Sequence, residues 1–363
     1  MKYNRYFERS KISFNKFRTS AGRYFLIVFL ILNAPLGAVL SSYIPSYDDR
    51  YEEDMEQARG DRDYFKEPVD AINYAQYHYV GAHAAERYPR FFSQYPLQDQ
   101  PIPGLLATGV RGLMMTTYNW SMSWSSILKE GRSVVCSYPK EESTVFQKNG
   151  KPLYQTLHYE MNRIFNFLKS HPKAVITIIF EDYANPGKMV RDLREISIKN
   201  SYDPILRPSD WPAAQQKGEW PTLGWMRKNN KRLIMFTKVH DQHTEYTWPE
   251  TNYFWHNMTG TMNDNIACTE EQHAAIEPHQ PNRSLVSFGC YGNPSINPNR
   301  RDCLDYNALK DLTTTCQKKG FAKGKLFNGY WANYIISVVN GLVRDGKKTI
   351  FDYVNELNVM KKK

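Results

Sequence analysis

The amino-acid sequence predicts an α/β fold with a mainly parallel sheet. Beyond residue 70, short β-rich runs alternate with helical or irregular stretches, and such alternation is typical of parallel strands joined by crossover helices. The run VITIIF at residues 175–180 has almost no polar side chain, as expected for a strand that is buried on both faces. A chain of 363 residues is also long enough for such a sheet to close into a barrel.

Seven segments are predicted as strands, at residues 77–82, 110–117, 133–136, 174–180, 233–236, 284–288 and 325–330. One helix is clear from its periodicity, because apolar residues spaced three and four apart form a single stripe before residue 174. The stripe consists of Leu157, Met161, Ile164, Phe165 and Leu168. His171 and Pro172 are expected to end this helix, since a proline disfavours the helical conformation of the residue before it.

Residues 1–42 have the layout of an export signal. A basic leader precedes an uninterrupted apolar run, Tyr24–Leu32, which is broken by Asn33 and Pro35 and resumes at residues 36–40. This order is typical of secretory signals and signal anchors. The short run favours cleavage, the long leader favours a retained anchor, and an ordinary buried helix is a third alternative. Either of the first two makes the barrel extracytoplasmic, in a secreted or a membrane-anchored protein.

Much of the formal net charge of +10 lies at the two ends of the chain. Residues 1–23 contain one acidic side chain, Glu8, and residues 361–363 are all lysine. The segment between them is only mildly basic and lacks the basic and aromatic residues that alternate at fixed spacing in nucleic-acid-binding surfaces. We therefore expect no nucleic-acid partner.

Two segments flank the expected barrel, which we place at residues 70–340. Residues 43–69 are rich in Asp, Glu, Arg and Tyr without sustained apolar periodicity, which is typical of a linker or a loosely packed N-terminal extension. Residues 341–363 are expected to form a C-terminal helix and a basic tail.

The chemistry of a parallel barrel belongs at the carboxyl ends of its strands. In this sequence those ends hold His83, Met114, Thr116, Cys136, Ser137, Glu181, Asp182, Lys238–His243 and Tyr330. The set is polar enough for a functional site, but only one histidine directly follows an early strand.

The order of several motifs resembles the phosphatidylinositol-specific phospholipase C X-domain proteins, in particular the type common in plants and microbes. The motifs are GAHAAERY, QDQPIPGLLATGVRGLMMTTYNW, SVVCSYP, FLKSHPKAVITIIFEDY, EWPTLGWMRKNNKRLIMFT, NRSLVSF and FNGYWANY, and they cover most of residues 75–335. The resemblance implies a TIM-type (β/α) barrel of the phospholipase C-like phosphodiesterase kind.

The resemblance also implies a reaction. In such enzymes one histidine takes a proton from the attacking hydroxyl, and a second histidine stabilises the pentavalent phosphoryl group, usually beside a calcium ion held by Asn, Glu and Asp oxygens. His83 matches the first histidine, and Glu181 matches a metal-binding glutamate. Asp182, next to it, is a further candidate metal ligand, so calcium is the cofactor that the resemblance implies.

The sequence departs from that pattern at four positions. The asparagine expected after the first histidine is Ala84, the acids expected on the second strand are Met114 and Thr116, and the second histidine falls at or beside Ser137. Residues two apart in a strand share a face, so Met114 and Thr116 take the inward positions where carboxylates would lie. Arg111 has the opposite parity, and the family's GVR motif implies a structural role for it.

Other residues are weaker candidates. Ser137 could act as a nucleophile beside His83, and Asn328 with Tyr330, on the last strand, could contact the substrate. His240 and His243 could ligate zinc or supply a replacement base, or could belong to a solvated loop. The aromatic and Met side chains after the second strand could insert at a lipid surface or belong to a core or lid; they are Tyr118, Trp120, Met122 and Trp124.

Four of the five cysteines cluster between residues 268 and 316. Their spacing, an oxidising compartment and the family resemblance together favour a disulfide between Cys303 and Cys316, across a short helical stretch. The alternative is that all thiols are reduced, which would follow if the N-terminal segment is not an export signal.

Two functions remain open from the sequence. The first is a phosphoric diester hydrolase of the phospholipase C class with a strongly degraded active site, acting on or binding a phosphoinositide or another phosphodiester. The second is an inactive relative that binds a lipid headgroup or a protein. Both make a membrane or a phosphoinositide-type lipid the expected partner; the sequence names no protein partner.

Overall fold

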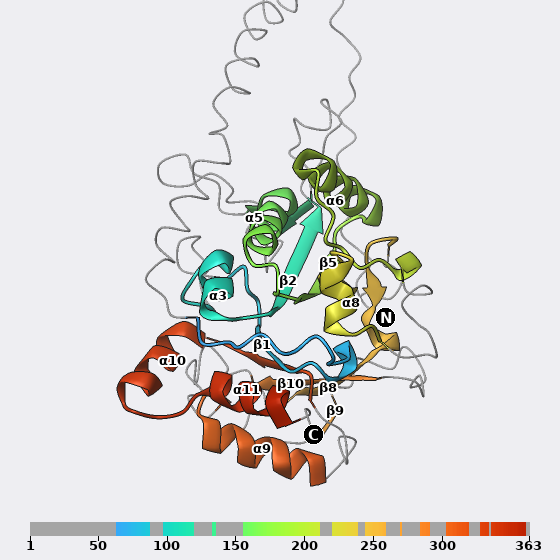
Figure 1. Cartoon of the computed structure of the whole chain (residues 1–363). Helices are drawn as coiled ribbons and strands as arrows, with labels where there is room; N and C mark the ends of the chain where they lie inside the picture. Colours follow the sequence, from blue (N-terminus) through green and yellow to red (C-terminus); the bar gives the residue numbers. More distant parts are fainter. Residues whose placement is uncertain are drawn as a thin grey trace, which may run out of the picture. The chain divides into compact units, whose positions relative to one another are not determined.

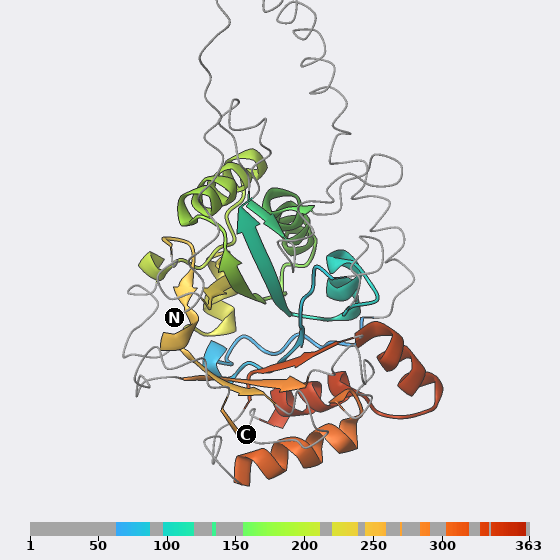
Figure 2. The same ribbon diagram turned by 180° about the vertical axis from the view of Figure 1, so that it is seen from behind.

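The computed structural model describes residues 63–87, 97–119, 133–135, 155–210, 220–238, 244–258, 269–270, 284–290, 303–318, 327–333 and 335–360. A curled, mainly parallel sheet runs through this part of the chain, and the α-helices lie on the outside of the curl (Figures 1 and 2). This is the α/β barrel type of fold that the alternation of strands and helices predicts.

The strands are β1 (Tyr79–Ala82), β2 (Gly112–Asn119), β3 (Ser133–Val135), β4 (Gln155–Thr156), β5 (Ile176–Tyr183), β6 (Leu233–Thr237), β7 (Trp248–Pro249), β8 (Phe254–Met258), β9 (Thr269–Glu270), β10 (Leu285–Cys290) and β11 (Gly329–Ala332). The α-helices are α3 (Ile102–Thr108), α5 (Leu157–Ser170), α6 (Pro186–Asn200), α8 (Leu223–Lys228), α9 (Tyr306–Lys318), α10 (Ile335–Arg344) and α11 (Ile350–Met360). Short 3₁₀ turns cover Tyr74–Gln76, Pro208–Asp210 and Glu250–Asn252.

Hydrogen bonds connect the strands in the order β7-β6-β5-β2-β1-β11-β10-β8-β9. All neighbours from β7 to β8 are parallel, and β8 pairs with β9 antiparallel. The two ends of the path approach each other, because Phe236 on β6 packs edge-to-face on Phe254 of β8, with ring centroids 4.8 Å apart. Aromatic packing therefore helps to close the curl.

The seven predicted strands are all present, with shifts of a few residues at their ends, and the predicted helix is α5. Residues 133–136 differ in role, because β3 pairs antiparallel with the end of β2 and then with β4, outside the path of the parallel strands. Strand β8 was not predicted from the sequence, although it pairs in parallel with β10 over five residues. Its short FWHNM sequence interrupts the apolar run with two polar residues.

A tryptophan fills the inside of the curl between β1, β2 and β11. A Cβ atom at Gly81 would lie 2.3 Å from the ring of Trp331, and one at Gly112 would lie 2.9 Å from it. Trp331 is fully buried and packs edge-to-face on Tyr79. Tyr330, the neighbouring residue, instead contacts Tyr353 of α11 on the outer side. The odd-numbered residues of β1 and β11 therefore face inward, as strand alternation requires.

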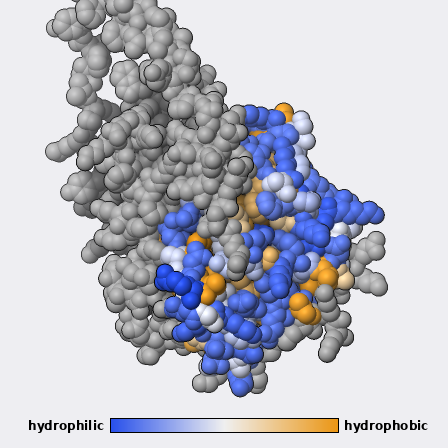
Figure 3. Space-filling view, turned by 60° about the vertical axis from the view of Figure 1, so that its left-hand side comes forward, coloured by the Kyte–Doolittle hydropathy of each residue, from blue (hydrophilic) through white to orange (hydrophobic). Residues whose placement is uncertain are grey.

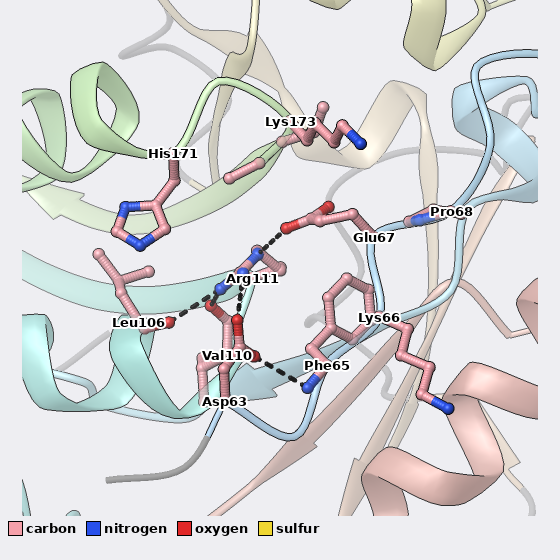
Figure 4. Close-up of polar contacts among 12 residues, drawn as sticks. Asp63, Phe65, Lys66, Glu67, Pro68, Leu106, Val110, Arg111, His171 and Lys173 are labelled. Atoms are coloured by element: carbon pink, nitrogen blue, oxygen red, sulfur yellow. Dashed lines mark hydrogen bonds and ion pairs between the residues drawn. The ribbon is translucent and has the colours of Figure 1, made fainter. Parts of the chain in front are cut away.

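The segment before β1 is tightly packed, which corrects the expectation of a loose linker up to residue 69. Figure 4 shows Arg111, at the start of β2, as its centre. The Arg111 Nε donates to Glu67 Oε1 at 2.7 Å, and the guanidinium lies 5.3 Å from the rings of both Phe65 and Phe167. Burial of Arg111 at the amino end of β2 confirms its structural role. Residues 43–62 lie outside the described residues.

The C-terminal helix also belongs to the barrel rather than extending from it. Helix α11 lies beside α9 and against β1 (Figures 1 and 2). Asn358 of α11 accepts a hydrogen bond from the backbone N–H of His78 at 3.0 Å and donates to its carbonyl at 2.9 Å. On the face drawn in Figure 3, the described surface is mostly hydrophilic with separate small apolar spots. Among the described residues, no helix has the length and apolarity required to cross a membrane.

Candidate functional site

The carboxyl ends of β1 and β11 bring His83 and Asn333 together. The backbone N–H of His83 donates to the carbonyl of Ala332 at 3.0 Å, which continues the parallel pairing one residue beyond the strands. His83 Nδ1 lies 3.0 Å from Asn333 Oδ1. Because an amide oxygen can only accept, Nδ1 carries the proton and the imidazole lone pair is on Nε2. Asn333 thus selects the tautomer in which Nε2 can act as a base.

His83 is neutral at pH 7. Burial lowers the pKa of the imidazole from 6.5 to about 4, and the charges of Lys238 and Arg87 add to this effect. The hydrogen bond to Asn333 and the charge of Glu181 oppose it without cancelling it. A neutral imidazole with its lone pair on Nε2 can accept a proton, which is the role that the sequence predicts for His83.

A second group of side chains lies on the inward faces of β2 and β5. Thr116 pairs in register with Glu181, and its Oγ1 donates to Glu181 Oε2 at 3.3 Å. The Lys238 Nζ, from the residue after β6, lies 2.9 Å from Glu181 Oε1 and 3.7 Å from the sulfur of Met114. Met114 and Thr116 therefore occupy the inward positions predicted for them. They lie beside the Glu181 carboxylate, which is paired with the Lys238 ammonium group.

The pairing changes the acidity of Glu181. Burial raises the pKa of its carboxyl, but the nearby charge of Lys238 and the hydrogen bond from it lower the pKa, and the net shift is downward. Glu181 is consequently a carboxylate at neutral pH, and Lys238 neutralises it.

These residues do not fit the calcium ion that the resemblance implies. Calcium takes six to eight oxygen ligands. At the matching positions Ala84 offers no side-chain oxygen, Met114 offers a thioether, and Glu181 is paired with Lys238. Over the part of the chain that the structure describes, no group of three or more His, Cys, Asp or Glu side chains could hold a metal ion.

Asp182 does not join Glu181, although the two are adjacent. Successive side chains of a strand point to opposite faces, and Asp182 accepts a hydrogen bond from Thr117 Oγ1 at 2.6 Å and one from the backbone N–H of Ala184 at 3.0 Å. Its side chain is fully buried there, and burial raises the pKa of its carboxyl. Asp182 therefore anchors the end of β5 on the other side of the sheet, so the predicted pair of metal ligands is separated.

The two predicted substrate-binding residues have structural positions. Asn328 precedes β11, at the amino end of the sheet, where it accepts from the backbone N–H of Val286 at 2.9 Å and donates to the carbonyl of Ala75 at 2.7 Å. Tyr330 is buried against Phe327 and Tyr353. Neither side chain lies at the end of the barrel where His83 is found.

Several other candidates lie outside the described residues. They are Ser137, His240, His243, Trp120, Met122 and Trp124. Tyr118 is described, and its ring stacks on that of the partly exposed Tyr183 with centroids 5.0 Å apart.

Ala84, which follows His83, has a left-handed backbone with φ of 46°. Among non-glycine residues, this region favours Asn and Asp, and it is strained for other side chains. The conformation therefore suits the asparagine that the family pattern has at this position better than it suits alanine.

Cys303 and Cys316 are both buried; the first precedes helix α9 and the second lies near its carboxyl end. At 1.5 Å per residue, the helix separates Tyr306 from Cys316 by about 15 Å. The Cα atoms of a disulfide are usually about 4.4–6.8 Å apart. A bridge between these two residues would require the chain before Tyr306 to run back along the helix, and it stays a prediction.

The sequence assigned no role to Lys238, which was one of several polar residues at strand ends, and did not single out Asn333. Each directly follows a buried strand, as His83 does, so the rule that located His83 applies to both. Their partners, however, come from strands that are far away in the sequence. Glu181 precedes Lys238 by 57 residues, and His83 precedes Asn333 by 250 residues.

Comparison with known proteins agrees with the motifs. A PI-PLC X domain-containing protein of Arabidopsis thaliana is 25% identical over 269 residues, which cover 72% of this chain and 55% of the relative. The chain thus spans about half the length of that relative.

Two bacterial structures have low overall similarity to the chain. The phosphatidylinositol-specific phospholipase C of Listeria monocytogenes has a TM-score of 0.44 and 12% identity, covering 78% of this chain and 97% of its own. The calcium-dependent phosphoinositol-specific phospholipase C of a Pseudomonas species has a TM-score of 0.36 and 13% identity, covering 62% of this chain and 79% of its own. TM-scores below 0.5 add nothing to the family assignment.

The family model described as PI-PLC X 1 matches residues 73–284. This match covers more than half of the 363 residues and includes β1, β2, β5 and β6, the strands whose ends carry His83, Thr116, Glu181 and Lys238. The chain therefore belongs to the PI-PLC X family.

Proposed function

We propose that the carboxyl end of the barrel binds the phosphate-bearing headgroup of a phosphoinositide or another phosphodiester, without calcium-dependent cleavage. The observation that carries this proposal is the cluster of His83, Asn333, Thr116, Glu181 and Lys238 at the ends of five neighbouring strands. The cluster combines hydrogen-bonding groups and an ordered ammonium group, which are groups that recognise phosphate oxygens.

The expected losses in reaction rate favour binding of a headgroup over its catalytic cleavage. Loss of one general acid or base costs about 10²- to 10⁴-fold in rate, and loss of a metal clamp removes several kcal/mol of transition-state stabilisation. Ala84 and Met114 provide no side-chain oxygen for calcium, and the position expected for the second histidine is at or beside Ser137. His83 can accept a proton but cannot at the same time neutralise the charge that develops on the phosphorane.

Slow, metal-independent cleavage of a phosphodiester is the second candidate. It is favoured by the hydrogen bond between His83 Nδ1 and Asn333 Oδ1, which leaves the lone pair of the imidazole on Nε2. In this reaction Nε2 would take the proton of the attacking hydroxyl. It predicts product release that persists with chelator and is lost in His83→Ala.

The test uses the full chain and vesicles of phosphatidylinositol in phosphatidylcholine, with calcium or with chelator. We expect binding that requires phosphatidylinositol and is unchanged by chelator, with no release of inositol phosphate above the His83→Ala background. Turnover of about 1 to 10³ per second, abolished by chelator and by His83→Ala, would show that the site is a calcium-dependent enzyme. Equal binding to vesicles of phosphatidylcholine alone would remove the headgroup proposal.

A further inference from the structure

We propose that Gln98 is the positioning residue of the candidate site, because it fixes the ends of β1 and β11 so that His83 meets Asn333. The inference rests on the proposed headgroup binding, in which both of these side chains take part. It concerns a residue in the segment before α3, to which the resemblance to the family gives no role.

The side-chain amide of Gln98 is hydrogen-bonded to the ends of both strands. Its Nε2 donates to the carbonyl of His83 at 2.7 Å and to the carbonyl of Ala332 at 3.0 Å. His83 directly follows β1, and Ala332 is the last residue of β11. Gln98 is fully buried, so bulk water does not compete for either bond. One amide group therefore connects the two strands at the point where the candidate site begins.

The backbone of the same segment holds the turn that follows His83. The N–H groups of Leu97 and Gln98 both donate to the carbonyl of Arg87, at 2.8 and 2.9 Å. The N–H of Arg87 in turn donates to the carbonyl of Ala84 at 3.0 Å. The turn after His83 is therefore closed by its own hydrogen bond and joined to residues 97 and 98.

Asp99, the next residue, holds the chain on the other side of the site. Its carboxylate accepts a hydrogen bond from the backbone N–H of Ser337, in the first turn of α10. A carboxylate is favourable there, because the first N–H groups of a helix have no partner within the helix and carry partial positive charge. Asn333 lies between Ala332, which Gln98 holds, and this first turn. Consecutive residues therefore fix the chain on both sides of Asn333.

The amide of Gln98 is chemically suited to this position. Its NH₂ group supplies two N–H donors, one for each carbonyl. A methionine of similar length offers none. Without these bonds the two strand ends are held less closely, and His83 loses its fixed orientation towards Asn333 Oδ1. An imidazole without that acceptor exchanges between its two tautomers. A segment that only stabilises the fold would leave the tautomer of His83 unchanged when Gln98 is replaced.

The experiment records the ring-nitrogen NMR signals of the full chain, labelled with nitrogen-15 in histidine, at pH 7. These signals distinguish protonated from unprotonated ring nitrogens, and His83→Gln identifies those of His83. The main variant is Gln98→Met. Thr108→Val is the matched control, because the buried Thr108 donates to the carbonyl of Gly104 at 2.9 Å near the amino end of the barrel. Thermal unfolding followed by circular dichroism establishes that each variant is folded.

We expect the wild-type chain to show His83 protonated at Nδ1 alone, and Gln98→Met to populate both tautomers. In calorimetry with chelator present, Gln98→Met should weaken binding of myo-inositol 1-phosphate by about twofold to tenfold, as for the loss of one well-placed hydrogen bond. Thr108→Val also removes a buried hydrogen bond and lowers stability, but it should leave the tautomer and the affinity unchanged.

The outcomes separate this inference from the proposed function. A single Nδ1 tautomer and wild-type affinity in a folded Gln98→Met variant would reject the inference and leave headgroup binding in place. Mixed tautomers in Thr108→Val as well would show that general loosening, rather than Gln98, changes the imidazole, and would also reject it. Absence of binding by the wild-type chain would reject the proposed function, whereas the tautomers would still decide whether Gln98 positions His83.

A second variant keeps the test decisive if Gln98→Met does not fold. Gln98→Asn retains the amide but is one methylene shorter, so it is too short to bond both carbonyls as Gln98 does. We expect it to populate both tautomers of His83. A single Nδ1 tautomer in this variant, with wild-type affinity for myo-inositol 1-phosphate, would contradict the inference.

Discussion

At the scale of single residues, the protonation of His83 links the site to stability. Its pKa of about 4 lies below the ordinary value of 6.5, so between these values the unfolded chain binds a proton that the folded chain does not. Stability therefore falls as the pH decreases from about 6.5 towards 4, and His83 contributes no pH dependence above that window.

We predict that a histidine titration by NMR will give His83 a midpoint near pH 4. Lys238→Met should raise the midpoint, because a positive charge that disfavours imidazolium is removed, and Glu181→Gln should lower it. In denaturant unfolding, His83→Gln should reduce the loss of stability as the pH falls from 6.5 towards 4. A wild-type midpoint at the ordinary value of 6.5 would contradict the lowered pKa that we expect for His83.

Ala84 permits a second prediction, about backbone strain. Its φ of 46° is costly for alanine, whereas glycine adopts it readily. We expect Ala84→Gly to leave the free energy of unfolding within about 0.5 kcal/mol or to increase it, because relief of strain offsets the greater entropy of the unfolded chain.

The matched control is Ala85→Gly. Ala85 is fully buried and is not among the residues with positive φ, so this change should lower the free energy of unfolding by about 1 kcal/mol. Equal destabilisation by the two substitutions in urea would show that residue 84 is unstrained.

At the scale of elements, the segment Asp63–Pro68 packs against the amino end of the barrel and forms hydrogen bonds with it. Besides the contacts of Arg111, Asn355 of α11 accepts from the backbone N–H of Lys66 and donates to the carbonyl of Tyr64, each at 2.9 Å. Arg227, in α8, donates to the carbonyl of Pro68 at 2.9 Å. This short segment therefore contacts helices α8 and α11, which are distant from each other in the sequence.

We predict that Glu67→Gln lowers the free energy of unfolding by about 1.5–3 kcal/mol, because Arg111 is buried and would lose a charged partner. Glu195→Gln is the control, since Glu195 is 46% exposed and 3.9 Å from Arg191, and exposed pairs contribute about 0–1 kcal/mol. Denaturant unfolding measures both. Similar effects of the two changes would show that the segment does not stabilise the barrel through Glu67.

At the scale of the whole molecule, the export signal predicted at residues 1–42 stays a prediction, because this segment lies outside the described residues. We propose that the chain is exported or membrane-anchored with the barrel extracytoplasmic. Its basic leader and apolar run have the pattern that translocation machinery recognises.

Replacement of Val28 and Leu30 by arginine should leave the chain in the cytosol, since charged residues within an apolar run prevent its insertion. Cell fractionation with an antibody to the barrel provides the measurement. Replacement of Lys361 and Lys362 by serine is the control, because it changes charge outside the predicted signal and should leave the distribution unchanged. If the arginine variant is distributed between the cell fractions as the wild-type chain is, the proposal of export is wrong.

The sequence alone determined the fold class, the positions of most strands and the residues His83, Met114, Thr116 and Glu181 at their ends. These features are local, because a buried strand needs an apolar run and strand alternation then decides which side chains share a face. The family match over residues 73–284 follows from the same local motifs.

Only the tertiary structure decided which side chains meet. It paired Glu181 with Lys238, placed Asn333 against His83, separated Asp182 from Glu181 and buried Asn328 and Tyr330 away from the site. The structure also shows that β3 pairs antiparallel with β2 and that the segment Asp63–Pro68 packs on Arg111. Such contacts join residues that are distant in sequence, and they depend on the register and curl of the whole sheet, which no local pattern of residues specifies.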